Sequence, residues 1–333
     1  MGKMAFIKQY SKKEEYFKKE EISKISFYQS IILWYRKIFS IILKKEYQDS
    51  LLFFIPEFKP KREEKVVAKL IKNLEKENIT SVILSKKLEQ EENFKNILNA
   101  KGYTILDGRM LFRSLSADVL EYIAKQQDRK LEMQEVVLLV NEDTSINGQL
   151  IIDLSKRVKN IKIITNHIEQ FKKLGESLYH SDGIMIGITN NKQKGLKKAK
   201  IILNIDFPEE LVNLYTINRE AILINLPGKI LIRKKGFNGI YIHDLKIRFN
   251  NELDEKYEQN NVIEEFRKEL LLEKLIYDKK NYQEIQKSLK EVNTKIENLI
   301  GIMELSQERN IKEWKKWNKI IGKDKTKRKQ LVN

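Results

Sequence analysis

The chain has 333 residues, of which 41% are hydrophobic, and a formal net charge of +17. This length allows two or three domains with a sizeable core, and the absence of cysteine excludes disulfides and thiolate chemistry. Its three histidines include no close pair, so no metal site is predicted. The basic charge is typical of a lysine-rich solvated surface, or of a protein that attracts nucleic acid or an anionic membrane.

Residues 1–48 are predicted to be helical. An apolar stripe at helical spacing runs through Phe27, Ile31, Tyr35, Ile38 and Ile42. This stripe favours a helix docked on the protein body, and an interfacial amphipathic helix or a partner helix are the alternatives. The first residues lack the apolar core of a secretory signal, and Arg36 and Lys37 disfavour a spanning helix. A cytoplasmic location is therefore expected.

Residues 49–130 are predicted to form a small, mostly parallel α/β lobe. Short apolar runs alternate with amphipathic segments there. The predicted strands are 51–55, 81–84 and 103–106, and the predicted helices cover 66–74, 90–99 and a long segment from Leu111 to Ile123. A polar link, Lys125–Gln134, indicates a domain boundary.

Residues 131–250 are predicted to form a second α/β lobe, of Rossmann-like type. The stretch Val136–Asn166 has the length and pattern of a strand–helix–strand crossover. Further strands are expected at 184–188, 201–204 and 221–225, and a terminal hairpin at 230–232 and 240–242. The predicted fold is therefore α/β with two lobes, the second a mostly parallel sheet, and with helical extensions at both ends.

The last segment, residues 251–333, is predicted to contain a long helix and a basic tail. Apolar residues follow alternating four- and three-residue steps from Leu271 to Met303, which is a heptad pattern. This seam predicts a coiled coil, with a homodimer through 271–303, or a long helical hairpin. A helix that packs on its own lobe is the alternative. Residues 311–330 carry Trp314 and Trp317 among lysines, a pattern that suits nucleic acid or an anionic membrane surface.

The turn after the strand Val136–Val140 is where a Rossmann unit binds the pyrophosphate of a dinucleotide. That chemistry needs glycines, so that the backbone can approach the phosphates, and the N–H groups of the following helix. Here the turn reads Asn141 to Gly148, with Glu142 and Asp143 in it. A carboxylate ~4 Å from a phosphate costs on the order of 1–4 kcal/mol per charge pair. A structural turn, capped by Thr144, Ser145 or Asn147, is the favoured interpretation.

Two short elements of this lobe resemble the NADP lobe of shikimate dehydrogenases and glutamyl-tRNA reductases. Asn166-His167 is similar to that family's Asn-Arg-Thr element, and Ile202–Asp206 is similar to its Ile-Asn-Ala-Thr stretch, in which only Asn204 carries over. The resemblance implies NADP as the cofactor, with Asn166, His167 and Asn204 as candidate contacts. The turn after the first strand adds Asn141, Thr144 and Ser145 as candidates. The glycine fingerprint is missing. The first lobe also has no Asn-Val-Thr-x-Pro stretch, so the family's catalytic lysine and aspartate cannot be placed in this sequence.

A second candidate site binds anions. Arg109 and Arg113 follow a predicted parallel strand, and Lys86 and Lys87 end the previous one, at the edge where α/β lobes bind ligands. A turn with solvated charges is the plainer interpretation. Three functions are compatible with these patterns: a non-catalytic binding or assembly role on a degenerate Rossmann-like domain, an NAD(P)-dependent oxidoreductase with an atypical phosphate loop, or nucleic-acid or anionic-surface binding through the C-terminal helix.

Overall fold

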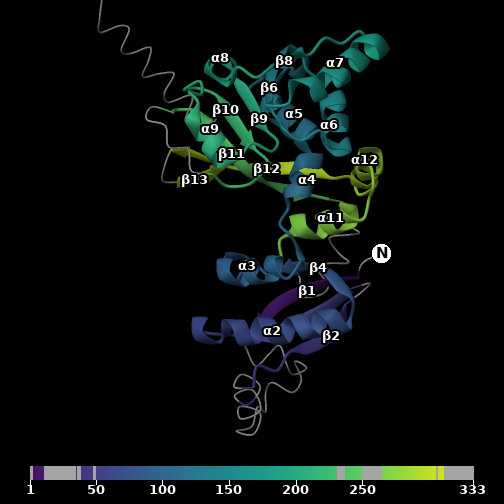
Figure 1. Cartoon of the computed structure of the whole chain (residues 1–333), viewed down its shortest axis with the longest axis vertical. Coiled ribbons are helices and arrows are strands. Elements are labelled where there is room, and N and C mark those ends of the chain that lie inside the picture. The colour runs from purple at the N-terminus through teal and green to yellow at the C-terminus, as the bar shows by residue number, and fades with distance from the viewer. Residues whose placement is uncertain are drawn as a thin grey trace, which may run out of the picture. The chain divides into compact units, whose positions relative to one another are not determined.

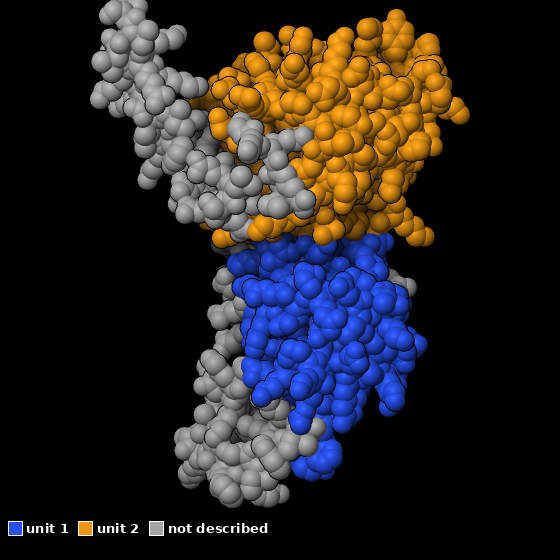
Figure 2. All heavy atoms as spheres, turned by 60° about the vertical axis from the view of Figure 1, so that its left-hand side comes forward, with its two compact units in different colours: residues 1–107, 254–278 blue, residues 108–253, 279–333 orange. Residues whose placement is uncertain are grey.

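The computed structural model describes residues 3–10, 35, 39–47, 50–230, 237–249, 265–304 and 307–310. The chain divides into two compact units, one of residues 1–107 with 254–278 and one of residues 108–253 with 279–333 (Figure 2). The first division falls after Asp107, ahead of the expected boundary at 125–134. No helix within the described ranges is both long and apolar enough to cross a membrane.

The described strands of the first unit form a five-stranded sheet in the order β2-β3-β1-β4-β5. They are β1 (Lys3–Tyr10), β2 (Leu43–Tyr47), β3 (Ser50–Pro56), β4 (Ile79–Leu84) and β5 (Thr104–Leu106). β1, β3, β4 and β5 run parallel, and β2 pairs antiparallel with β3. The α-helices among the described residues of this unit are α2 (Pro60–Lys76), α3 (Glu92–Ala100) and α11 (Lys268–Tyr277).

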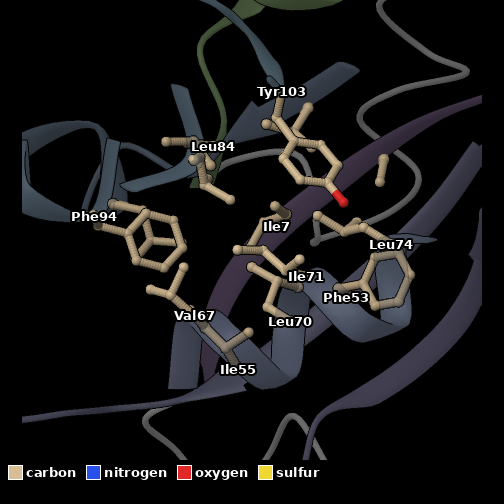
Figure 3. Packing of buried hydrophobic residues seen from close by; sticks show 14 of the residues in the cluster. Ile7, Phe53, Ile55, Val67, Leu70, Ile71, Leu74, Leu84, Phe94 and Tyr103 are labelled. Atoms are coloured by element: carbon tan, nitrogen blue, oxygen red, sulfur yellow. The ribbon is translucent and has the colours of Figure 1, made fainter. Parts of the chain in front are cut away.

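Buried side chains cover both faces of this sheet. On one face Ile7 and Phe53 pack with Leu70 of α2 and Phe94 of α3 (Figure 3). On the other face Phe6 packs with Phe266 and with residues of α11, and the two rings meet edge to face at 5.2 Å. Successive residues of β1 thus enter opposite layers, as the period of two in a strand requires.

The N-terminal prediction of a helix over 1–48 is wrong for the residues described. Lys3–Tyr10 is the central strand β1, and Leu43–Tyr47 is the edge strand β2. β1 has an apolar run of four residues, Met4–Ile7, which is typical of a buried strand, but charged and amide residues flank it and the helical spacing further along the segment dominated the prediction. Most of the apolar stripe from Phe27 to Ile42 lies outside the described residues; Tyr35 is exposed and Ile42 packs on the core.

The second unit contains a sheet with the order β13-β12-β11-β10-β9-β6-β7-β8 (Figure 1). Its parallel strands are β6 (Glu135–Leu139), β7 (Asn160–Ile164), β8 (Gly187–Thr189), β9 (Ile201–Asn204), β10 (Ile222–Asn225) and β11 (Ile240–Arg248). Numbered along the chain, these six follow the order 3-2-1-4-5-6 of dinucleotide-binding folds. The Rossmann-like prediction is confirmed.

The α-helices described in the second unit lie before, between and after these strands. They are α4 (Arg109–Ser114), α5 (Ser116–Gln126), α6 (Ser145–Ser155), α7 (Ile168–Asp182), α8 (Lys192–Lys198), α9 (Glu209–Leu214) and α12 (Tyr282–Glu291). The predicted long helix 111–123 is divided at Leu115, where the Ser116 hydroxyl donates to the carbonyl of Arg113 at 2.7 Å. The predicted strand 184–188 begins at Gly187 instead, and the predicted hairpin partner 231–232 lies outside the described residues.

The prediction of one long helix over 271–303 is wrong. The segment contains the end of α11, then α12, then the strand β12 (Lys295–Glu304), which pairs antiparallel with β11 and with β13 (Gln307–Asn310). α11 ends at Tyr277, and Asn281 starts α12 as its N-cap, because its side chain accepts the N–H of Glu284 at 2.9 Å. Asn293, at φ 49°, turns the chain into β12. The seam residues Leu271, Ile285 and Leu299 are buried inside their own units.

Candidate functional site

The turn after β6 begins the candidate site, at the carboxyl ends of the parallel strands. Thr144 caps α6, because its Oγ1 accepts the N–H of Asn147 at 3.2 Å. The Asn147 side chain is fully buried and its Nδ2 donates to the carbonyl of Glu142 at 2.8 Å. The predicted capped turn is confirmed, and Thr144 is the capping residue among the three considered.

Asp206, which follows β9, closes this turn from the neighbouring strand. Its Oδ1 accepts the N–H of Asn141 and its Oδ2 accepts the N–H of Glu142, both at 2.7 Å. β9 pairs with β6 in the register Leu139 with Asn204, so the two strands end side by side at the point where the strand order reverses. One carboxylate therefore accepts hydrogen bonds from two neighbouring N–H groups in the turn between β6 and α6.

Burial and hydrogen-bond donors act on the pKa of Asp206 in opposite directions, and burial has the larger effect. Burial raises the pKa of Asp206, and the two N–H groups together with Arg113 act in the opposite direction. Burial also lowers the pKa of Arg113, while the carboxylates of Asp206 and Glu142 raise it. Arg113 Nη2 lies 3.5 Å from the carbonyl oxygen of Ile205. The predicted anion-binding residue Arg113 thus faces anions that belong to its own chain.

Asn141 and Asn166 join the ends of β6 and β7. The Oδ1 of Asn141 accepts a hydrogen bond from the N–H of Asn166 at 2.9 Å, and the Oδ1 of Asn166 accepts one from the ammonium group of Lys192. Lys192 is buried at the start of α8, and its Nζ lies 5.8 Å from the centre of the Tyr215 ring. Two of the predicted cofactor contacts are therefore brought together, along with a cation that was not predicted.

A second asparagine pair joins the ends of β9 and β10. Asn204 Nδ2 donates to Asn225 Oδ1 at 2.5 Å and to the carbonyl of Phe207, while Asn225 Nδ2 donates to the carbonyl of Gly228 at 2.6 Å. Both asparagines are fully buried. Gly228 also accepts the Tyr241 hydroxyl at 2.8 Å, and burial raises the pKa of Tyr241 to about 12. Asn204 is thus a structural residue in this network.

The remaining predicted contacts lie at the rim. Ser145 is the exposed first residue of α6, and His167 is exposed before α7, with its N–H donating to Thr165 Oγ1 at 3.0 Å. Asp206, Asn225 and Lys192 were not predicted as site residues. The signal was present in part, since an asparagine stands at or just after the end of β6, β7, β9 and β10, but each pairing depends on which strands are neighbours.

The four predicted anion-binding residues belong to different units. Lys86 and Lys87 lie in the first unit, where Lys87 pairs with Glu57 at 2.6 Å. Arg109 and Arg113 lie in the second unit. The Arg109 guanidinium packs so closely on Gly228 that a Cβ at Gly228 would lie 2.9 Å from Arg109 Nη2. A single anion site made of all four remains a prediction.

No protein-family model matches the sequence, and no curated protein matches it. Among solved structures, a shikimate dehydrogenase in complex with NADP+ is similar over 71% of this chain and 81% of that chain, at 10% identity and a TM-score of 0.28. An aspartate transcarbamoylase from Trypanosoma cruzi, in its ligand-free form, is similar over 67% and 71%, at 10% identity and a TM-score of 0.25. At these TM-scores neither similarity bears on function, which has to be inferred from the geometry.

Proposed function

We propose that this protein is a non-catalytic binding protein whose Rossmann-like unit has lost dinucleotide binding. The supporting observation is that the Asp206 carboxylate accepts the N–H groups of Asn141 and Glu142. In a nucleotide-binding unit, backbone N–H groups of the first strand–helix turn receive the pyrophosphate. Here an internal carboxylate takes two of them.

A pyrophosphate entering this turn would meet two obstacles. It would have to displace the Asp206 carboxylate from both N–H groups, which costs hydrogen bonds to a charged acceptor. It would also lie near the carboxylates of Asp206 and Glu142, and each charge pair at ~4 Å costs on the order of 1–4 kcal/mol. That repulsion corresponds to roughly a tenfold to several-hundred-fold loss of affinity.

The second candidate function is an NADP-dependent oxidoreductase. It is favoured by the strand order of the second unit and by Lys192, whose ammonium group lies against Asn166 at the end of β7. A cation and an asparagine at this place would suit the phosphate on an adenosine ribose. This candidate requires the Asp206 carboxylate to leave the turn when the cofactor binds.

Thermal unfolding with millimolar NAD, NADH, NADP and NADPH tests the two candidates. A ligand at 100 times its dissociation constant stabilises the folded protein by about 2.7 kcal/mol. We expect no shift with any of the four. A shift with NADP or NADPH that disappears in Lys192→Gln, but persists in the matched surface variant Lys173→Gln, would reject our proposal and establish the oxidoreductase candidate.

The predicted assembly and surface-binding roles stay separate proposals. Residues 311–330 lie outside the described residues, and the homodimer through 271–303 no longer has a continuous helix to support it. Sedimentation of the full chain measures the oligomeric state. Binding of nucleic acid or anionic vesicles through 311–330 should weaken steeply with salt, and a full-length variant with neutral residues at Lys315, Lys316 and Lys319 should lose it.

A further inference from the structure

The amino edge of the second unit's sheet carries a cavity of about 900 Å3, which we call the amino-edge cavity. Its walls are the starts of β6 and β7, four residues of the link (Arg129, Lys130, Met133 and Gln134) and five residues of the α8 region (Lys194, Gly195 and 198–200). Dinucleotide-binding folds use the opposite edge, where the strands end. The cavity is therefore separate from the turn that Asp206 closes, and a ligand in it would not depend on the proposed loss of dinucleotide binding.

Positive side chains dominate the lining of this cavity. The link supplies Arg129 and Lys130, the β7 region supplies Lys159 and Lys162, and the α8 region supplies Lys194, Lys198 and Lys200. Against these seven cations the lining has one carboxylate, Glu135, which is 3.2 Å from Asn160 Nδ2. The lining thus carries six more positive than negative charges.

These cations have no carboxylate partners within the described residues. None of the seven forms an ion pair there, whereas Lys156 and Lys172, on other surfaces of the same unit, do. Six of the seven are exposed, and Lys162 is half-buried. Like charges gathered around one concave surface repel each other and raise the local concentration of anions. An anion from outside the chain would relieve this repulsion.

The floor of the cavity is apolar and strengthens this field. Val136, Val137 and Ile161, from the starts of β6 and β7, are buried beneath the charged rim. A low-dielectric wall beneath charges of one sign focuses their field into the opening. The carbonyl end of α8 points its weak negative dipole toward this edge, but Lys198 and Lys200 lie at the same place and outweigh it.

We infer that the amino-edge cavity binds a compact polyphosphate anion. Six excess charges call for a ligand with several negative charges, because a single phosphate would neutralise only part of them. Six of the seven cations are lysines, which bind phosphate oxygens as point charges from many directions. The lining contains no aromatic side chain on which a base could stack, which disfavours single-stranded nucleic acid. The volume suits a small molecule rather than a duplex.

Calorimetric titration of the full chain with inorganic tripolyphosphate tests this inference. The test variant Lys159→Gln/Lys198→Gln removes two exposed charges from opposite walls. The control variant Lys173→Gln/Lys246→Gln removes two exposed charges elsewhere in the same unit, so its net charge is identical. We expect the dissociation constant to rise about tenfold or more in the test variant and less than about twofold in the control. Wild-type binding should weaken as salt rises from about 50 to 300 mM.

Three results would overturn the inference. One is no measurable binding of tripolyphosphate, and another is an equal loss in test and control variants, which would show attraction by overall charge. The third is a DNA duplex that binds more tightly than tripolyphosphate and loses its binding in the test variant, which would make nucleic acid the ligand. The thermal shift with NADP can also be compared between variants. If Lys192→Gln keeps a shift that the test variant loses, NADP binds in the amino-edge cavity, which would support the inference.

Discussion

Replacing Asp206 by alanine is the most direct test of whether this carboxylate stabilises the turn between β6 and α6. The substitution removes both acceptors, so the N–H groups of Asn141 and Glu142 lose their partners at 2.7 Å. A hydrogen bond to a charged group contributes about 1.5–3 kcal/mol. Asp206 is only half-buried and its desolvation raises its pKa, so part of that gain is already offset and water can reach the freed donors. We therefore expect a net loss of about 2 kcal/mol in the free energy of unfolding.

Urea unfolding followed by circular dichroism measures this loss, and amide hydrogen exchange shows where it arises. The control is Asp143→Ala in the same turn, which removes the same charge from an exposed residue that makes no ion pair with another described residue. Exchange of the Asn141 and Glu142 amides should accelerate in Asp206→Ala alone. If the two variants unfold within about 0.5 kcal/mol of each other, or if these amides exchange equally in both, Asp206 does not hold the turn.

Substitutions at Asp118, Asn204 and two glycines test other parts of the second unit. Burial raises the pKa of Asp118 above its ordinary 3.8, so the stability that this group contributes is fully present below that value and is lost as pH rises through the raised pKa. Urea unfolding at about pH 3.5 and pH 7 should therefore show the stability of Asp118→Asn rising relative to that of the wild type as pH rises. A constant difference between the two proteins would contradict this. Asn204→Ala should cost about 3 kcal/mol, because it leaves buried partners unsatisfied, and a loss below about 1 kcal/mol would show that the network is dispensable. Gly148→Ala, with open space around its Cβ, should raise the stability of the protein through α6 by about 0.5–1 kcal/mol. Gly195→Ala should instead destabilise the protein by about 1–3 kcal/mol, because its Cβ meets the side chain of Ile164. Ile164→Val should then cost less stability in the Gly195→Ala background than alone, and additive effects would disprove that contact.

The sequence predicted elements well where one local signal dominated. The run Val136–Val140 is continuously apolar and became β6, and the periodicity of Val66, Leu70 and Leu74 became α2. The heptad spacing failed because it measures only the distance between apolar residues. Asn281 and Asn293 interrupt the helix through capping and a left-handed backbone, and neither changes the spacing of apolar positions. Turn chemistry therefore outweighed periodicity in this segment.

The candidate site was only partly predictable, for a different physical reason. Thr144 acts within its own turn, so its capping role follows from local sequence. Asp206 lies between β9 and α9, and no residue close to it in the sequence identifies its hydrogen-bond partners. Its partners lie more than sixty residues away, and they become neighbours only because β9 pairs with β6. The cations of the amino-edge cavity were likewise dispersed among three separate stretches of an already lysine-rich chain.

The chain passes three times between the two compact units, after residues 107, 253 and 278. Neither unit is therefore a continuous stretch of sequence. During synthesis, the first unit's sheet emerges early but waits for α11, which covers Met4 and Phe6, until much of the second unit has been made. The second unit in turn waits for β12 before β11 is paired on both sides. Fragments that end near residue 250 would leave both cores open, so binding and assembly have to be measured on the full chain.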